Sequence, residues 1–219
     1  MRINKFVALA TGMSRRQADN TIEEKAVLIN NIPAKHGQEV TESDTIKLNN
    51  HQIYIPEIKL LLINKPINIV CSHNGQGSKT IYDIIPDKYR NLKPVGRLDK
   101  DSSGLLLMTN HGRLSQQLTH PSFKKSKVYQ VKLDSPLSID DKQRIETGII
   151  LEDGVSKIQL QGSTRNWKVT MREGRNRQIR RTFSALGYTV IELHRIQIGN
   201  YKLGNLKPGE YIEVKGIEV

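Results

Sequence analysis

The first fifty residues carry apolar positions at spacings that predict two short helices followed by a hairpin. Apolar residues recur at helical spacing in two groups: Ile3, Phe6, Val7 and Ala10, then Ala18, Ile22 and Ala26. Ser14 and Gln17 have the spacing of a capping box, which predicts the start of the second helix. Apolar residues 27–29 and Ile32 then flank two asparagines, which tolerate the positive φ angles of a tight turn. We therefore expect a small α+β domain over residues 1–50.

The rest of the chain favours strands over helices. Apolar runs at 59–63, 104–108 and 188–193 predict strands, and helical patterns occur near 138–148 and 176–186. The connections are too short for regular strand–helix–strand crossovers, so we expect a mixed, largely antiparallel sheet flanked by helices. A polar stretch with a single proline predicts a linker at 51–58 and a second domain over 59–219, which makes the chain an α+β protein of two domains.

Composition indicates a globular protein with a polyanionic partner. Hydrophobic residues make up 37% of the chain, which is enough for a core. The 34 Lys and Arg against 22 Asp and Glu give a net charge of +12, which is compatible with RNA, DNA or an anionic membrane. No apolar run of about 18 residues and no secretory signal occur, so we expect a cytoplasmic protein.

Several kinds of chemistry lose support from the residues present. The single cysteine, Cys71, excludes an intramolecular disulfide and a cysteine-based zinc site within one chain. The six histidines show no paired metal-ligand spacing, and no phosphate-binding loop of nucleotide hydrolases occurs.

A polar loop at 96–104 runs directly into the apolar run 105–108 and contains Asp99. A carboxylate in such a loop lies at the edge of a sheet, where a rigid scaffold can hold it near cations and backbone donors. Asp99 is therefore a candidate catalytic group. The alternative is that Asp99 only caps a turn.

An arginine-rich segment at 173–181 opens the last expected helix. Its apolar face contains Ile179, Phe183 and Leu186. Arg177 and Arg181 lie on the opposite face and are expected to meet solvent or phosphate. Arg180 lies at the border of the apolar face, where an unpaired guanidinium is costly, so we expect a half-buried aspartate as its partner. The alternative is a basic helix whose arginines are all solvated.

The alternating stretch 127–133 predicts a strand in which Tyr129 shares a face with Val131 and Leu133, toward a core or a pocket. The alternative role of Tyr129 is packing alone. Basic residues also gather on the N-terminal helices, either as an RNA contact or as a solvated helix face: Arg2, Lys5, Arg15 and Arg16.

In this order, these segments resemble the pseudouridine synthase family that contains the small-subunit ribosomal RNA enzyme and its large-subunit relatives. Residues 1–48 resemble an S4 RNA-binding domain. The segment GRLDKDSSGLLLMTNHG at 96–112 resembles the signature around the family's catalytic aspartate. The segments KVY at 127–129, EGRNRQIRR at 173–181 and VIELHRIQIG at 190–199 resemble its remaining motifs.

The resemblance implies roles for particular residues. Asp99 would be the nucleophile, in the broad sense that it either attacks the sugar carbon or abstracts a sugar proton. Arg180 would pair with Asp99, Tyr129 would stack on the uracil, and Leu193 would help to wall the pocket. No cofactor and no metal are implied, because the isomerisation needs neither redox chemistry nor energy input.

The resemblance also implies a substrate: a uridine of ribosomal RNA, with the large subunit favoured over the small one, flipped out of its stack. Arg97 would fill the vacated space or hold the displaced backbone, while the S4-like domain, Arg177 and Arg181 would contact phosphates. We expect a monomer with no DNA or membrane partner. The rival hypotheses are a non-catalytic RNA-binding ribosome-assembly factor of the same fold and, more distantly, a DNA-binding protein.

Overall fold

A computed structural model describes residues 1–215 and divides the chain into two compact units, Met1–Ile58 and a second unit that begins at Lys59. No helix among the described residues is both long and apolar enough to cross a membrane.

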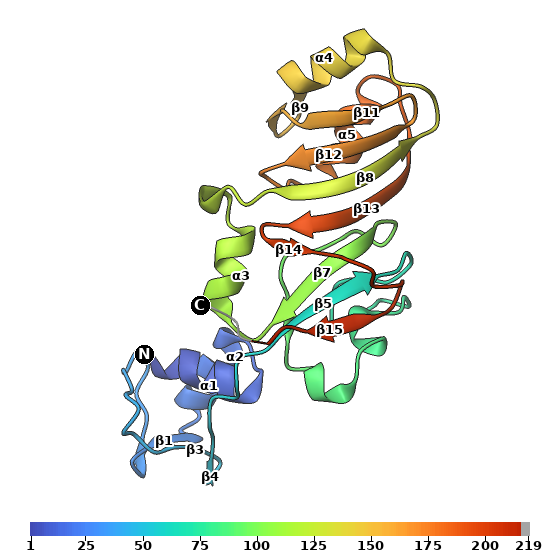
Figure 1. The fold of residues 1–219 in the computed structure, drawn as a ribbon. Coiled ribbons are helices and arrows are strands. Elements are labelled where there is room, and N and C mark those ends of the chain that lie inside the picture. The colour runs from blue at the N-terminus through green and yellow to red at the C-terminus, as the bar shows by residue number, and fades with distance from the viewer. Residues whose placement is uncertain (216–219) are drawn as a thin grey trace. The chain divides into compact units, whose positions relative to one another are not determined.

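The first unit contains two helices and a small antiparallel sheet of order β2-β1-β3-β4 (Figure 1). Its elements are α1 (Ile3–Thr11), α2 (Arg15–Glu23), β1 (Val27–Ile29), β2 (Ile32–Pro33), β3 (Ile46–Leu48) and β4 (His51–Gln52). The predicted capping box is present: Ser14 Oγ accepts from the Gln17 backbone N–H, and Gln17 Oε1 accepts from the Ser14 backbone N–H. Asn30 and Asn31 turn the β1–β2 hairpin with φ angles of 50° and 67°.

The start of the expected linker belongs to this sheet. His51 and Gln52 pair with β3 in an antiparallel arrangement, and the first unit extends to Ile58. The second unit begins at Lys59, where its first strand was expected.

The second unit is built on a sheet of order β11-β12-β8-β13-β7-β5-β15, with β14 beside β13 and β6 beside β7 (Figure 1). The strands of this sheet are β5 (Leu60–Lys65), β6 (Lys93–Pro94), β7 (Ser103–Thr109), β8 (Lys127–Leu133), β11 (Gln159–Ser163), β12 (Asn166–Met171), β13 (Val190–Ile198), β14 (Tyr201–Lys202) and β15 (Tyr211–Glu213). Strands β9 (Ile149–Leu151) and β10 (Gly154–Ser156) form a separate hairpin. Only the β7–β13 pair is parallel among these described strands, so the expectation of a mixed, largely antiparallel sheet is confirmed.

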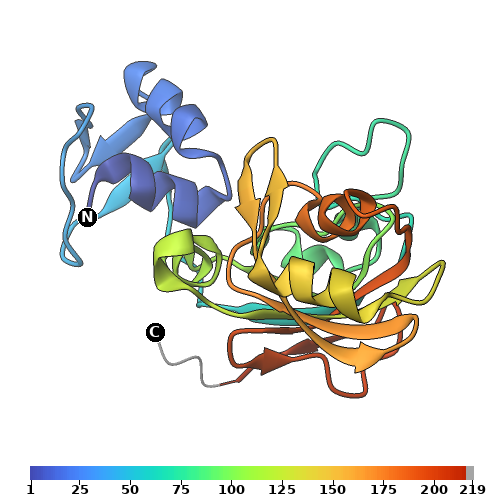
Figure 2. The ribbon, with the colours of Figure 1, turned by 90° about the horizontal axis from the view of Figure 1, so that it is seen from above.

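Three α-helices accompany the sheet: α3 (Gly112–Thr119), α4 (Ile139–Thr147) and α5 (Gln178–Ser184). Short 3₁₀ turns lie at Ile81–Asp83, Asp87–Tyr89 and Pro121–Phe123. Figure 2 shows α4 and α5 on the same side of the sheet. The predicted helical patterns near 138–148 and 176–186 are therefore confirmed.

The central strands β5 and β7 are buried on both faces, which explains why they read as continuous apolar runs and not as alternating ones. Within each of these two strands, successive residues point to opposite faces of the sheet and belong to two different core clusters. One cluster packs with Ile179 and Phe183 of α5 and contains Leu61, Ile63, Leu106 and Met108. The other packs with Leu114 and Leu118 of α3 and contains Leu60, Leu62, Leu105 and Leu107.

Candidate active site

The loop before β7 presents Asp99 from a fixed backbone. Its neighbours Leu98 and Ser102 are buried, and the Ser102 N–H donates to the Asp99 carbonyl at 3.1 Å. The Lys100 carbonyl accepts from the Asn68 N–H at 2.7 Å. The Asp99 side chain remains 35% exposed between these buried anchors. The carboxylate is thus held in place by the loop while its oxygens remain accessible.

Gly104 brings this loop against β13. Arg195 of β13 pairs with Gly104 in the parallel β7–β13 ladder. The φ angle of Gly104 is +101°, and an added Cβ would lie 2.2 Å from the Arg195 carbonyl oxygen. A residue with a side chain could not occupy this position without shifting backbone, so the close approach of the two strands requires glycine.

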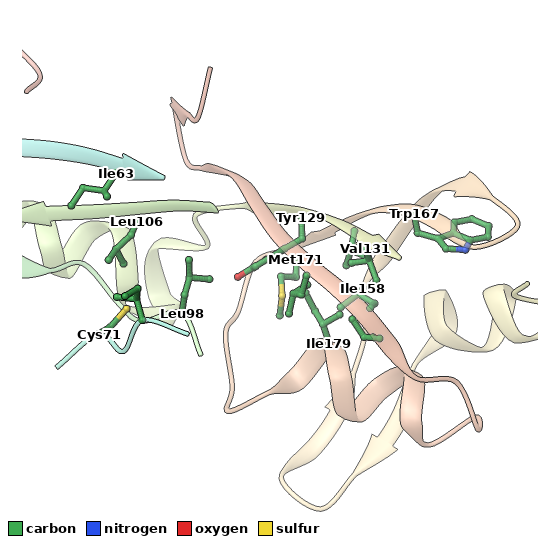
Figure 3. Close-up of a cluster of buried hydrophobic side chains, with 14 of the residues drawn as sticks. Ile63, Cys71, Leu98, Leu106, Tyr129, Val131, Ile158, Trp167, Met171 and Ile179 are labelled. Carbon is green, nitrogen blue, oxygen red and sulfur yellow. The ribbon is translucent and has the colours of Figure 1, made fainter. Parts of the chain in front are cut away.

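Asp99 lines a cavity of about 290 Å³, which we call the Asp99 pocket. Tyr129 from β8 and Leu193 from β13 also line it, so the pocket brings together three residues that the sequence had placed in separate motifs. Figure 3 shows the Tyr129 side chain beside Met171 and extending toward Leu98, with Val131 on the same face of β8. Arg97 and Arg177 line the pocket too, and both are exposed.

The ion pairs at the edge of the pocket centre on Asp101, two residues after Asp99. Arg177 donates to both oxygens of Asp101, at 3.0 and 2.9 Å. The hydrogen bonds from Arg177, followed by the charge of Arg180, lower the pKa of Asp101. Asp99 lies 3.6 Å from Arg177 Nη1, which is a looser contact.

The expected pair between Arg180 and Asp99 is replaced by a pair between Arg180 and Asp101. Arg180 Nε lies 3.3 Å from Asp101 Oδ2, and Nη2 donates to the Asp101 carbonyl at 2.9 Å. The reason is the anchoring of the guanidinium: Nη1 donates to the Val190 carbonyl on β13 at 2.7 Å, which holds Arg180 beside Asp101, two residues before β7 begins. Arg180 lies at the border of the buried face as predicted, and burial lowers its pKa, but its partner Asp101 is exposed and not half-buried.

The partners of Arg177 and Arg181 also differ from the expectation that these side chains meet solvent or phosphate. Arg177 is bound to Asp101, and Arg181 donates to both oxygens of Asp153 at 3.0 and 2.6 Å. Arg175 likewise donates to Asp153 and to the carbonyls of the β9–β10 hairpin. Asp101 and Asp153 lie in loops distant from α5 in sequence. Their ion pairs with Arg177 and Arg181 therefore hold the start of α5 against the loop before β7 and against the β9–β10 hairpin.

Three cations of the Asp99 pocket were not assigned from the sequence: Lys127 at the start of β8, Arg175 before α5 and Arg195 on β13. Arg195 could have been found from the sequence. It shares a strand face with Leu193, at a position where the alternation predicts an apolar residue, and an arginine there indicates a buried charge with a specific role. Nothing in the spacing distinguishes Asp101 from Asp99 as a partner for arginine, since both lie in the same loop.

Arg2, Lys5, Arg15 and Arg16 are exposed on the helical part of the first unit. Within residues 1–215 none of them forms an ion pair. The described residues also contain no cluster of three or more His, Cys, Asp or Glu that could hold a metal ion.

Comparison with known proteins adds family evidence to this geometry. Residues 59–185 match the family model for RNA pseudouridylate synthase, and residues 1–46 match the S4 domain. The chain is 33% identical to ribosomal large subunit pseudouridine synthase B of Bacillus subtilis, over 100% of the chain and 93% of that protein. It is 34% identical to ribosomal small subunit pseudouridine synthase A of Pasteurella multocida, over 100% of the chain and 98% of that protein.

A solved structure supports the same assignment across both units. The crystal structure of a pseudouridylate synthase superposes with a TM-score of 0.71 at 33% sequence identity, covering 98% of this chain and 96% of that one. The sequence match and the structural match agree on one family. The pocket that contains Asp99, Tyr129 and Leu193 is consistent with it. The chain therefore belongs to the RNA pseudouridine synthase family, as an isomerase that carries an N-terminal S4 domain.

Proposed function

We propose that this protein isomerises a uridine of ribosomal RNA to pseudouridine and that Asp99 is the catalytic carboxylate. The observation that carries the proposal is the position of Asp99 in one cavity with Tyr129 and Leu193, on a loop held by buried neighbours. Relatives named for ribosomal RNA of either subunit match the whole chain, which supports the substrate class.

The reaction breaks the C1′–N1 bond of uridine and joins C5 of the uracil to the same sugar carbon. Asp99 either attacks C1′ or abstracts a sugar proton while the uracil departs. Arg177, 3.6 Å away, helps to orient the Asp99 carboxylate. Arg180 acts as a positioning residue through Asp101, because it ties the loop that contains Asp99 to β13. Tyr129 stacks on the uracil and assists when C5 loses its proton.

The target uridine must leave its stack to enter the pocket, at a cost of a few kcal/mol. Arg97 is exposed at the Asp99 pocket and is suited to hold the displaced backbone. The exposed cations of the first unit would supply phosphate contacts. We propose cytoplasmic action on large-subunit RNA by a monomer. Relatives named for the two subunits match at 33% and 34% identity, so the modified positions must be mapped in both RNAs.

The test of the catalytic assignment is Asp99→Asn, measured by tritium release from C5-labelled ribosomal RNA transcripts. We expect isomerisation to be lost and RNA affinity to stay within severalfold of wild type, because the lost group acts in the chemical step. Asp87→Asn is the matched control, since Asp87 is 86% exposed and pairs only with Arg90 among the described residues. Normal turnover by the Asp99 variant would remove Asp99 from the mechanism. No turnover by the wild-type protein on either subunit's RNA would favour the non-catalytic assembly factor.

The RNA-binding role of the first unit is tested by Arg15→Gln/Arg16→Gln. If both arginines contact phosphates, the slope of log affinity against log salt concentration falls by roughly 1 to 2. Lys142→Gln/Arg144→Gln removes the same charge from α4, where both residues are ion-paired, and should leave the slope unchanged. Equal slopes for wild type and the Arg15/Arg16 variant would exclude these two contacts.

A further inference from the structure

A buried arginine of the Asp99 pocket, Arg195, has donors without a partner among the described residues. Arg195 is 2% exposed, and its Nε donates to the Leu105 carbonyl at 2.7 Å. Its Nη2 is buried and has no hydrogen-bond partner within the described part of the chain. A buried guanidinium costs several kcal/mol unless its charge is compensated. Since Arg195 lines the Asp99 pocket, a bound group can provide that compensation.

Lys127 brings a second cation to the same pocket. Its side chain forms no hydrogen bond or ion pair among the described residues, and its Nζ would lie 3.5 Å from a Cβ added at Gly174. Burial and then the positive charge of Arg195 lower the pKa of Lys127, while Glu173 opposes this shift. Two cations that disfavour each other in a partly desolvated pocket are stabilised together when an anion binds there.

The position of these two cations indicates which kind of anion they would bind. Arg195 is the Cα partner of Tyr129 across the β8–β13 ladder, and Lys127 precedes Tyr129 by two residues on the same strand. Both cations therefore adjoin the ring expected to stack on the pyrimidine, among the apolar side chains of Met171 and Leu193. A strongly hydrated phosphate is better matched by the exposed Arg97. A planar, delocalised anion suits the buried, partly apolar pocket.

The proposed reaction generates such an anion. When the C1′–N1 bond breaks, its electron pair stays with the uracil and is delocalised over N1, O2 and O4. The sugar carbon is then bonded to Asp99, or the sugar has lost a proton to it. No oxidant, reductant or further proton is needed at this step. Preorganised donors aimed at such developing charge are a large source of rate enhancement.

We propose that Arg195, assisted by Lys127, forms a binding site for the detached pyrimidine anion. This inference rests on the proposed function, and it assigns the two cations a role in stabilising the leaving base and holding it for reattachment. It predicts that the site prefers an anionic pyrimidine over a neutral one, whether or not turnover occurs.

The experiment uses barbiturate, a planar pyrimidine trione that is an anion at neutral pH, with neutral uracil and inorganic phosphate as comparison ligands. Their affinities for the full chain are measured by NMR titration. We expect wild type to bind barbiturate at least about tenfold more tightly than uracil, corresponding to about 1.4 kcal/mol. Arg195→Gln and Lys127→Met should each reduce this preference, while Arg195→Lys should retain part of it.

Lys142→Gln is the control because it removes a charge from α4, and it should leave the preference unchanged. If Arg195→Gln does not fold, Lys127→Met and Arg195→Lys still decide the question. Equal affinity for barbiturate and uracil, an unchanged preference in the foldable variants, or full competition by phosphate would each overturn the proposal. Because this readout needs no turnover, its failure is distinct from a failure of the Asp99 assignment.

Discussion

Exchanging each of the two loop aspartates for asparagine should separate the structural carboxylate from the catalytic one. Asp101 accepts two hydrogen bonds from Arg177 and lies 3.3 Å from Arg180 Nε, and the Arg180 side chain is only 13% exposed. Asp99 has a single 3.6 Å contact with Arg177. Asp101→Asn removes the charge that compensates a desolvated guanidinium, whereas Asp99→Asn removes a loose and partly exposed pair.

The magnitudes follow from these contacts. A hydrogen bond to a charged group contributes about 1.5–3 kcal/mol, and the 47% exposure of Asp101 lowers this, so Asp101→Asn should cost about 1–2 kcal/mol. Asp99→Asn should cost less than about 0.5 kcal/mol. For a unit of this size, 1 kcal/mol lowers Tm by about 2–4 °C, so Asp101→Asn should lower Tm by about 2–8 °C.

Urea unfolding followed by Trp167 fluorescence is the assay, because the only tryptophan of the chain lies buried in β12 of the second unit. With an m value of about 2 kcal/mol/M, Asp101→Asn should shift the midpoint down by about 0.5–1 M. The depressed pKa of Asp101 means that its stabilisation is full above the unfolded value of 3.8 and is lost as pH falls below it. Equal midpoints for the two variants at neutral pH, or a larger loss for Asp99→Asn, would refute this division of roles.

Two further predictions test the scaffold. Gly104→Ala should destabilise the second unit by about 2–4 kcal/mol, because its Cβ would meet Arg195 backbone and its φ is positive, whereas Gly112→Ala, with open space around it, should be neutral or slightly stabilising in the same urea assay. Burial raises the pKa of Tyr82 to about 12, so the unfolded chain releases this proton at lower pH than the folded one and stability should fall as pH rises from 10 to about 12. A titration of tyrosine ionisation followed by near-ultraviolet absorbance checks this. Tyr82→Phe should remove one tyrosine from the part of the titration curve at the highest pH, and an unchanged curve would contradict the prediction.

The sequence alone determined many of the helices and strands and part of the Asp99 pocket. Helix caps, asparagine turns and apolar periodicity are local signals, so α1, α2, the β1–β2 hairpin and strand β8 followed from neighbouring residues. The motif around Asp99 and the alternation that points Tyr129 inward are local as well. The resemblance to the pseudouridine synthase family then assigned Asp99, Tyr129 and Leu193 to one site, and all three line the Asp99 pocket.

Only the tertiary structure decided which charges meet. Asp99 and Asp101 share one loop and one residue type, and the choice between them depends on where β13 holds Arg180 through the Val190 carbonyl. The burial of Arg195 depends on the parallel approach of β7 at Gly104, which joins segments 91 residues apart. Side-chain pairing across such separations is fixed by strand order and register, and neither periodicity nor composition encodes these in any single stretch of chain.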